Sequence, residues 1–171
     1  GSSLMFNKYA TLDNHFGITG YPTGVMDMRK DIYTWYSMEQ TLNETEKKYP
    51  AQTGIGFYSE LKQNILSLDV HVYAKAADKY KVTVLLVEDN IIGYQSNYET
   101  GAKDDYVHNG VARISITDVL GDDCTTTKKN QVVKKHYEAT IPNSYKTHNM
   151  RIVVYVQRPY GSQESVYDYE N

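Results

Sequence analysis

The sequence is poor in cysteine, in tryptophan and in long apolar runs. Its 171 residues include a single cysteine, Cys124, so a disulfide within the chain is excluded. No apolar run approaches the roughly 20 residues that a membrane-spanning helix needs. The N-terminal residues GSSLMFNKYA lack the apolar core of a secretory signal. We therefore expect either a cytoplasmic protein or a fragment without its targeting segment.

Excess positive charge is also lacking, since 18 Lys and Arg face 21 Asp and Glu, for a net charge of −3. Without a basic face the chain lacks the attraction that drives most nucleic-acid binding, so we expect no nucleic-acid partner. What abounds is tyrosine, with 17 residues. Tyrosine favours strands, and its hydroxyl suits half-wet contact surfaces. Strand propensity is the simpler interpretation, and a ligand-contacting surface is the alternative.

The clearest strand pattern lies between Tyr80 and Thr117. Apolar residues on both faces of Tyr80–Val87 predict a central strand. In Val111–Thr117 the alternation predicts a half-buried strand, with Ala112, Ile114 and Ile116 inward and Val111, Arg113, Ser115 and Thr117 outward. The residues between these strands, Glu88–Asp105, are predicted to be a turn-rich insert.

Strand-like alternation dominates the whole chain after Pro50. Further strands are predicted at 54–61, 65–75, 132–141, 150–157 and 164–169, with a polar loop at 120–130 and a turn at 142–148. About seven strands with no helix between them are typical of an antiparallel sandwich of immunoglobulin type.

The chain before Pro50 has a different, α/β pattern. It predicts a helix at 3–14, a loop at 15–22, a strand at 23–28 and a helix at 32–48. Asp31 is the expected N-cap of the second helix, and Trp35 belongs to its apolar stripe. The change of pattern places a domain boundary near residues 49–51, giving domains 1–49 and 50–171.

The run Phe16-Gly17-Ile18-Thr19-Gly20-Tyr21-Pro22-Thr23 resembles the loop before the cis-proline strand of thioredoxin-like domains. The resemblance implies that Pro22 is a structural residue, with a cis bond after Tyr21. Residues 1–49 would then be the C-terminal part of such a domain. The preceding strand and the Cys-x-x-Cys motif of a working domain are not in this sequence.

A second run, from Leu86 to Ile92 with Gln95 and then from Tyr106 to Arg113, resembles the 28-kDa outer-membrane lipoprotein family of Gram-negative anaerobes. The resemblance implies a mainly β chain, in which an immunoglobulin-like antiparallel β-sandwich follows a short thioredoxin-like remnant. It also implies an outer-membrane, cell-surface location and an adhesin or receptor role. The lipid-bearing cysteine is absent here, so membrane contact would run only through an anchor outside this sequence.

Candidate chemical sites are few. Acidic neighbours should raise the pKa of Cys124, so we expect an exposed or half-buried loop cysteine without a catalytic role. Asp104, Asp105 and His108 are too few ligands for a zinc site, and the spacing of Glu88-Asp89-Asn90 is not that of an EF-hand. We therefore expect no metal and no cofactor.

The motif Tyr106-Val107-His108-Asn109 is the most distinctive local signal. Asn109-Gly110 predicts a turn, and His108 is predicted to hydrogen-bond the insert to the sheet. His108 and Asn109 are thus structural candidates. The candidate residues for ligand contact are Tyr94, Tyr98, Tyr106 and His108.

No catalytic triad or phosphate loop is present, so we predict that the chain is not an enzyme. The predicted function is a non-catalytic extracytoplasmic domain for adhesion, reception or structural binding of a protein or glycan. Two alternatives stay open: an accessory domain of a periplasmic thiol–disulfide oxidoreductase whose active half lies elsewhere, and a carbohydrate-binding module. Because the strand at 24–28 would lack neighbours, residues 1–49 should fold back on the sandwich or, as we favour, form a homodimer.

Overall fold

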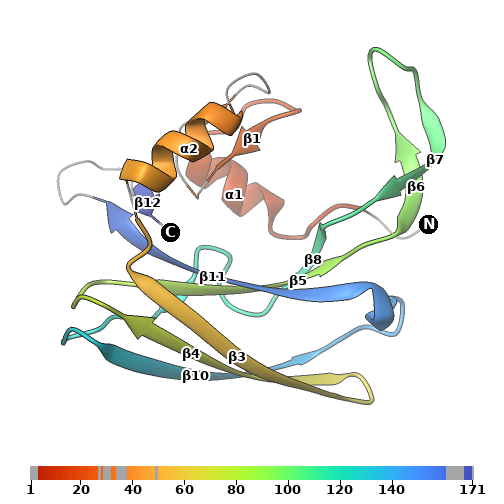
Figure 1. Cartoon of the computed structure of the whole chain (residues 1–171). Helices are drawn as coiled ribbons and strands as arrows, with labels where there is room; N and C mark the ends of the chain where they lie inside the picture. Colours follow the sequence, from red (N-terminus) through yellow and green to blue (C-terminus); the bar gives the residue numbers. More distant parts are fainter. Residues whose placement is uncertain are drawn as a thin grey trace.

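The computed structural model describes residues 4–26, 28, 32–33, 38–48, 50–160 and 168–170. Within them the chain is mainly β, with several antiparallel sheets and two short α-helices (Figure 1). The helices are α1 (Tyr9–Phe16) and α2 (Met38–Lys48). No helix in this described part is long and apolar enough to cross a lipid bilayer.

One sheet contains three long antiparallel strands, β3 (Thr53–Lys62), β4 (Ile65–Ala74) and β10 (Gln131–Thr140), in the order β10-β4-β3. The strands predicted at 54–61, 65–75 and 132–141 are thus confirmed. Alternation in β4 places one of its faces against the core, where every second residue is buried: Leu66, Leu68, Val70, Val72 and Ala74.

The second sheet has the order β12-β11-β5-β8, and β9 (Asp122–Asp123) also pairs with β5. Its strands are β5 (Lys81–Glu88), β8 (Val111–Ser115), β11 (Met150–Tyr160) and β12 (Asp168–Glu170). β5 is central, as predicted, because it pairs with β11 on one side and with β8 and β9 on the other. β12 lies at the predicted edge, while residues 164–167 of the expected strand lie outside the described residues.

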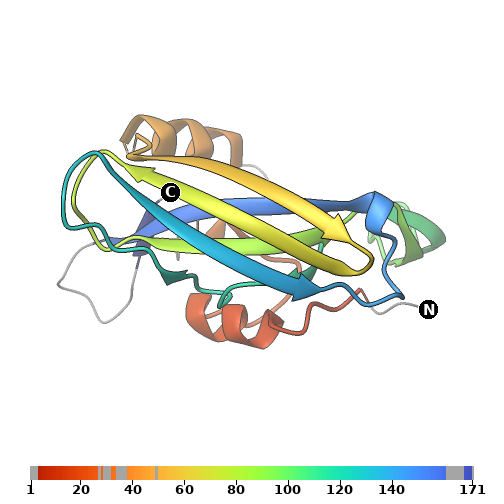
Figure 2. The ribbon, with the colours of Figure 1, turned by 90° about the horizontal axis from the view of Figure 1, so that it is seen from below.

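The main core lies between these two sheets, which Figure 1 shows one above the other and Figure 2 shows from the side of β3, β4 and β10. Side chains of β4 meet those of β5 and β11 there. The buried members are Leu68, Val70, Val72, Ala74, Tyr80, Val82, Val84, Cys124 and Val156. A smaller cluster of Leu66, Leu86 and Ile141 continues the core toward one end.

The predicted facing of β8 is wrong in part. The register of β5 against β8 shifts between Leu86 and Val87, so that Leu86 faces Ile114 but Val87 faces Ala112. Arg113 is the extra residue of this β-bulge, which reverses the side-chain alternation on either side of it. Arg113 is therefore only 7% exposed, although the alternation placed it outward.

The second predicted helix is also wrong at its start. Ile32–Tyr33 forms a short strand, β2, antiparallel to β1 (Gly24–Val25), and α2 begins only at Met38. β-branched and aromatic residues favour the strand, whereas the α2 residues are mostly good helix formers. Asp31 and Trp35 lie outside the described residues.

Helix α1 is shifted from its predicted position at 3–14. It begins at Tyr9 and ends at Phe16, where the left-handed Gly17 returns its N–H to the Asp13 carbonyl. The peptide bond between Tyr21 and Pro22 is cis, as predicted.

The N-terminal part of the chain contacts the β-rich part directly. Val25 and Met28 line a cavity of about 490 Å³ together with Ile55 of β3 and residues 154–156 of β11. The Tyr155 hydroxyl lies 3.7 Å from the Met28 sulfur. These contacts correspond to the fold-back alternative. The homodimer and the domain boundary near residue 50 stay predictions.

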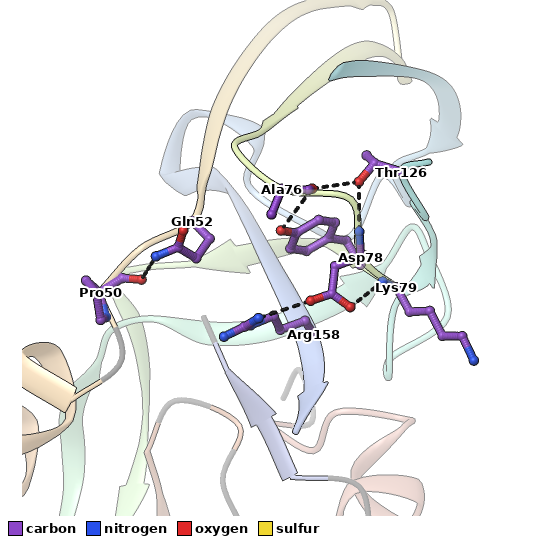
Figure 3. Close-up of polar contacts among 8 residues, drawn as sticks. Pro50, Gln52, Ala76, Asp78, Lys79, Thr126 and Arg158 are labelled. Atoms are coloured by element: carbon purple, nitrogen blue, oxygen red, sulfur yellow. Dashed lines mark hydrogen bonds and ion pairs between the residues drawn. The ribbon is translucent and has the colours of Figure 1, made fainter. Parts of the chain in front are cut away.

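A polar cluster fixes the connection between β4 and β5 (Figure 3). The Asp78 carboxylate accepts hydrogen bonds from the Lys79 amide at 2.7 Å and from Arg158 at 3.0 Å. The Thr126 hydroxyl accepts from the Asp78 amide and donates to the Ala76 carbonyl. The segment after β9, which carries Thr126, is thereby held against the core, although the sequence predicted a polar loop.

Candidate functional site

The predicted turn-rich insert is an ordered hairpin, which corrects the sequence-based expectation. β6 (Ile91–Gln95) and β7 (Lys103–His108) pair antiparallel as a separate two-stranded sheet. Figure 1 shows this β6–β7 hairpin standing away from the two main sheets. Its apolar residues explain the pairing, because Ile91, Ile92 and Tyr94 are strong strand formers.

The base of the hairpin is held by a network around Asp89. Its carboxylate accepts two hydrogen bonds from Arg151, from Nε at 2.6 Å and from a terminal nitrogen at 2.8 Å. The same carboxylate accepts the amide of Gly110 at 2.7 Å. The Arg151 guanidinium, and then the Gly110 amide, hold the pKa of Asp89 below its usual range. Asp89 therefore joins the end of β5, the start of β8 and the start of β11.

Asn109 adds a second bond at the same place. Its side-chain oxygen accepts the backbone N–H of Asn90 at 2.9 Å. Asn90 and Gly110 both have positive φ angles, of 57° and 67°, which suits the two sharp turns at the hairpin base. The structure thus places Asn109 in a structural position, at the turn that the sequence predicted.

Beneath this network lies a buried ion pair that the sequence analysis missed. Arg113 Nε lies 3.1 Å from Glu88 Oε2, and only 4% and 6% of the two side chains are exposed. The Arg113 guanidinium also lies 4.3 Å from the centre of the Tyr145 ring. In the sequence, an arginine within an apolar strand indicated that Arg113 needs an acidic partner. Only the bulge, however, directs the Arg113 side chain inward to Glu88.

The two faces of the hairpin differ in exposure. Ile92 and Val107 are cross-strand partners, and Tyr94 follows Ile92 on the same face. These three side chains are 71%, 46% and 59% exposed. Tyr98, between the strands, is fully exposed at 105%. The hairpin therefore presents apolar and aromatic side chains, which we call the hairpin face: Ile92, Tyr94 and Val107 on one side of the strands, with Tyr98 in the connecting turn.

The predicted ligand-contact residues do not all come together. Tyr106 and His108 lie on the opposite face from Tyr94, and their rings meet edge-on at 4.9 Å. A Cβ placed on Gly93 would lie 3.7 Å from both His108 and Leu4, so the N-terminal segment passes close to this face. Tyr94, Tyr98 and Tyr106 are all accessible, Tyr106 with 44% exposed, whereas His108 is partly covered.

His108 does not make the predicted hydrogen bond between insert and sheet. Its Nε2 is buried and has no hydrogen-bond partner in the described part of the chain. The bonds that tie the insert to the sheet come instead from Asp89 and Asn109. Asn109 makes this bond in place of its neighbour His108, because the turn directs the Asn109 side chain toward Asn90.

No metal site is assembled among the described residues, where no group of three or more His, Cys, Asp or Glu converges. Glu88 and Asp89 are each paired with an arginine. Asp104 and Asp105 are exposed on β7.

Cys124 is also unlike its prediction, which was an exposed or half-buried thiol. It is 1% exposed within the main core. Burial, more than the nearby Asp123, raises the pKa of the thiol. The expected direction of the pKa shift is thus confirmed, with desolvation as its main cause.

Comparison with known proteins gives two matches. The family model described as Outer membrane protein Omp28 matches residues 9–168. The fold is similar to that of HBP35 of Porphyromonas gingivalis, with a TM-score of 0.73 and 18% sequence identity over 95% of this chain and 55% of that chain. The chain thus spans about half the length of that structure. No curated protein matches the sequence.

Proposed function

Because this chain belongs to the Omp28 family of outer membrane proteins, we propose that it is a non-catalytic, extracytoplasmic binding domain that contacts its ligand through the hairpin face. The observation that carries the proposal is the exposure of Ile92, Tyr94 and Tyr98 on a hairpin that stands away from the main sheets. Solvent-exposed apolar and aromatic side chains gathered on one element often mark an interaction site.

The β6 side of the hairpin is also uncharged, whereas β7 carries Lys103, Asp104 and Asp105. Residues 91–98, IIGYQSNY, contain no acidic or basic side chain. Its base is rigid, because Asp89 and Asn109 bond it to the neighbouring strands. A rigid base lowers the ordering cost of binding, so a small contact surface gains affinity. A protein ligand with an apolar patch fits this surface best.

The proposal includes an immunoglobulin-like sandwich for the β-rich part and a thioredoxin-like origin for residues 1–49. Two antiparallel sheets with a shared core support the sandwich. A helix, a loop with a cis-proline, two short antiparallel strands and a second helix follow one another there, and this order supports the origin of the N-terminal part. A lipid anchor outside this sequence would hold the domain at the cell surface.

The proposal is tested by a panel of immobilised extracellular proteins and a glycan array. The triple variant Ile92→Ser/Tyr94→Ser/Tyr98→Ser is expected to lose the binding that the unaltered chain shows. The matched control Ile65→Ser/Tyr73→Ser/Tyr9→Ser removes an isoleucine and two tyrosines that are 47%, 39% and 43% exposed elsewhere, and it should keep that binding. Equal binding by both variants would refute the hairpin face.

The carbohydrate-binding alternative has less support. Sugar-binding platforms present aromatic rings on a common surface, but Tyr94 and Tyr106 lie on opposite faces of the hairpin. If the glycan array gives a signal that is lost in Tyr106→Ser and kept in Tyr94→Ser, the ligand is a sugar on the other face.

A redox role of Cys124 itself has little support, because burial raises the pKa of its thiol, whereas the oxidoreductase alternative places the active half outside this sequence and stays open. A catalytic thiol needs a lowered pKa and access to its substrate. Insulin reduction by dithiothreitol should proceed no faster with the chain than without it. Acceleration that disappears in Cys124→Ser would assign a redox role to this thiol.

A further inference from the structure

Strand β3 is exposed over nearly its whole length. It lies at the edge of its sheet, and the only strand paired with it among the described residues is β4. All nine residues from Gly54 to Lys62 are exposed. An exposed edge strand offers unpaired backbone N–H and C=O groups to another strand.

The apolar face of β3 is left uncovered as well. Phe57 is the cross-strand partner of Val70, and Leu61 is the partner of Leu66. Val70 and Leu66 are 0% and 5% exposed, whereas Phe57 and Leu61 are 48% and 43% exposed. The second sheet thus covers β4 but leaves the same face of β3 open at Phe57 and Leu61. This gap leaves apolar surface beside an open strand edge.

Charge does not protect this edge. Residues 53–59, TGIGFYS, are uncharged, and the only charged side chains of β3, Glu60 and Lys62, pair with each other at 2.9 Å. By contrast, β7 carries Lys103, Asp104 and Asp105, the kind of side chains that keep edges apart. A strand of this composition is suited to pairing with an equally uncharged strand.

We propose that β3 pairs antiparallel with β3 of a second copy of this chain, across a two-fold axis at Ser59. This register places Phe57 opposite the partner's Leu61 and Leu61 opposite the partner's Phe57. The small Ser59 faces its own copy at the axis, where close approach is needed. Phe57 and Leu61 of each copy thereby gain an apolar cross-strand partner.

The same register brings no like charges together. Glu60 falls opposite the partner's Tyr58, and Lys62 falls opposite the partner's Gly56. The two three-stranded sheets become one continuous sheet, in which neither copy of β3 is an edge strand any longer. A two-fold axis is the commonest symmetry by which a surface patch binds the same patch of a second copy.

Sedimentation velocity of the full chain over a range of concentrations tests the dimer. The unaltered chain is expected to dimerise, and Phe57→Lys should weaken the dimer by about tenfold or more, because both symmetric Phe–Leu pairs are lost. Ile92→Lys, the matched control on the hairpin face, should dimerise like the unaltered chain. Circular dichroism confirms that each variant is folded.

The register itself is tested by a double variant. In Phe57→Lys/Leu61→Glu each introduced lysine faces the partner's introduced glutamate, so dimerisation should return. Within one chain the two positions are four residues apart, about 13 Å along a strand, which is too far for direct pairing. A monomeric unaltered chain at the highest concentration overturns the dimer. Failure of the double variant to associate, or loss of the dimer in Ile92→Lys, overturns this interface.

Discussion

Arg113 and Glu88 form an ion pair in which Nε and Oε2 are 3.1 Å apart and neither side chain is more than 6% exposed. The second carboxylate oxygen of Glu88 accepts the backbone N–H of Lys146 at 3.3 Å. The ring of Tyr145 lies under the guanidinium. Glu88 thus connects the end of β5 both to β8 and to the segment before β11.

Removal of Arg113 should strongly destabilise the protein. Arg113→Ala leaves the Glu88 carboxylate buried without its charge partner, and the expected loss in free energy of unfolding is about 3–5 kcal/mol. Urea denaturation measures this loss. The double variant Glu88→Leu/Arg113→Met has no buried charge and should regain most of the lost stability. If the double variant is less stable than Arg113→Ala, then the pair contributes more than the penalty for an unpaired charge.

The Asp89–Arg151 interaction should make stability depend on acid pH. The pKa of Asp89 is lowered in the folded protein, whereas an unfolded aspartate titrates near 3.9. Its contribution is therefore complete above about pH 4 and is lost as the pH falls through the lower, folded pKa. In Asp89→Asn the decline of stability below about pH 4 should be shallower than in the unaltered chain. Asp105→Asn, which changes an exposed acid of β7, should leave the slope as it was.

Replacement of His108 distinguishes ring packing from hydrogen bonding. His108→Phe keeps a ring beside Tyr106 and removes a buried nitrogen that has no described partner. Stability should therefore stay the same or rise by about 1 kcal/mol. His108→Ala removes the ring as well and should lower the denaturation midpoint. An equal decrease in both variants would indicate a hydrogen bond from the imidazole.

Gly121 should not tolerate a side chain. It has a φ of +86°, and a Cβ there would lie 2.9 Å from Lys81 Cβ and 3.0 Å from Thr83 Oγ1. We expect Gly121→Ala to cost about 1–3 kcal/mol, through overpacking and an unfavourable backbone conformation. The control Gly20→Ala has open space around its Cβ and should lower the melting temperature much less. Similar melting temperatures for the two variants would contradict this expectation.

The sequence predicted the long strands well because their side-chain pattern and their burial agree. In β4, the apolar residues of the alternation are those that the structure buries. β5 carried apolar residues on both faces and proved to be central. Such patterns arise because apolar side chains are buried away from water and polar ones are not. One sequence is therefore enough to reveal them.

The candidate site could be predicted only in part, because the positions of its side chains depend on the turns and bulges of the backbone. Asn109-Gly110 was identified as a turn, but the pairing of β6 with β7 was hidden by the polar residues between them. The burial of Arg113 follows from one extra residue in β8, which no periodicity reveals. The contact of Asp89 with Arg151 joins positions 62 residues apart. Long-range pairs of this kind depend on the folded topology.

The bonding of Asp89 to Arg151 has a mechanical consequence. The hairpin leaves the sheet at the end of β5, where Glu88 is the cross-strand partner of Met150. Tension applied to the hairpin along the axis of β5 therefore loads all eight β5–β11 residue pairs in shear, and they must break together rather than one after another. The salt bridge at Arg151 transfers part of that tension directly into β11. A ligand that pulls on the hairpin would thus act on the most resistant direction of the central strands.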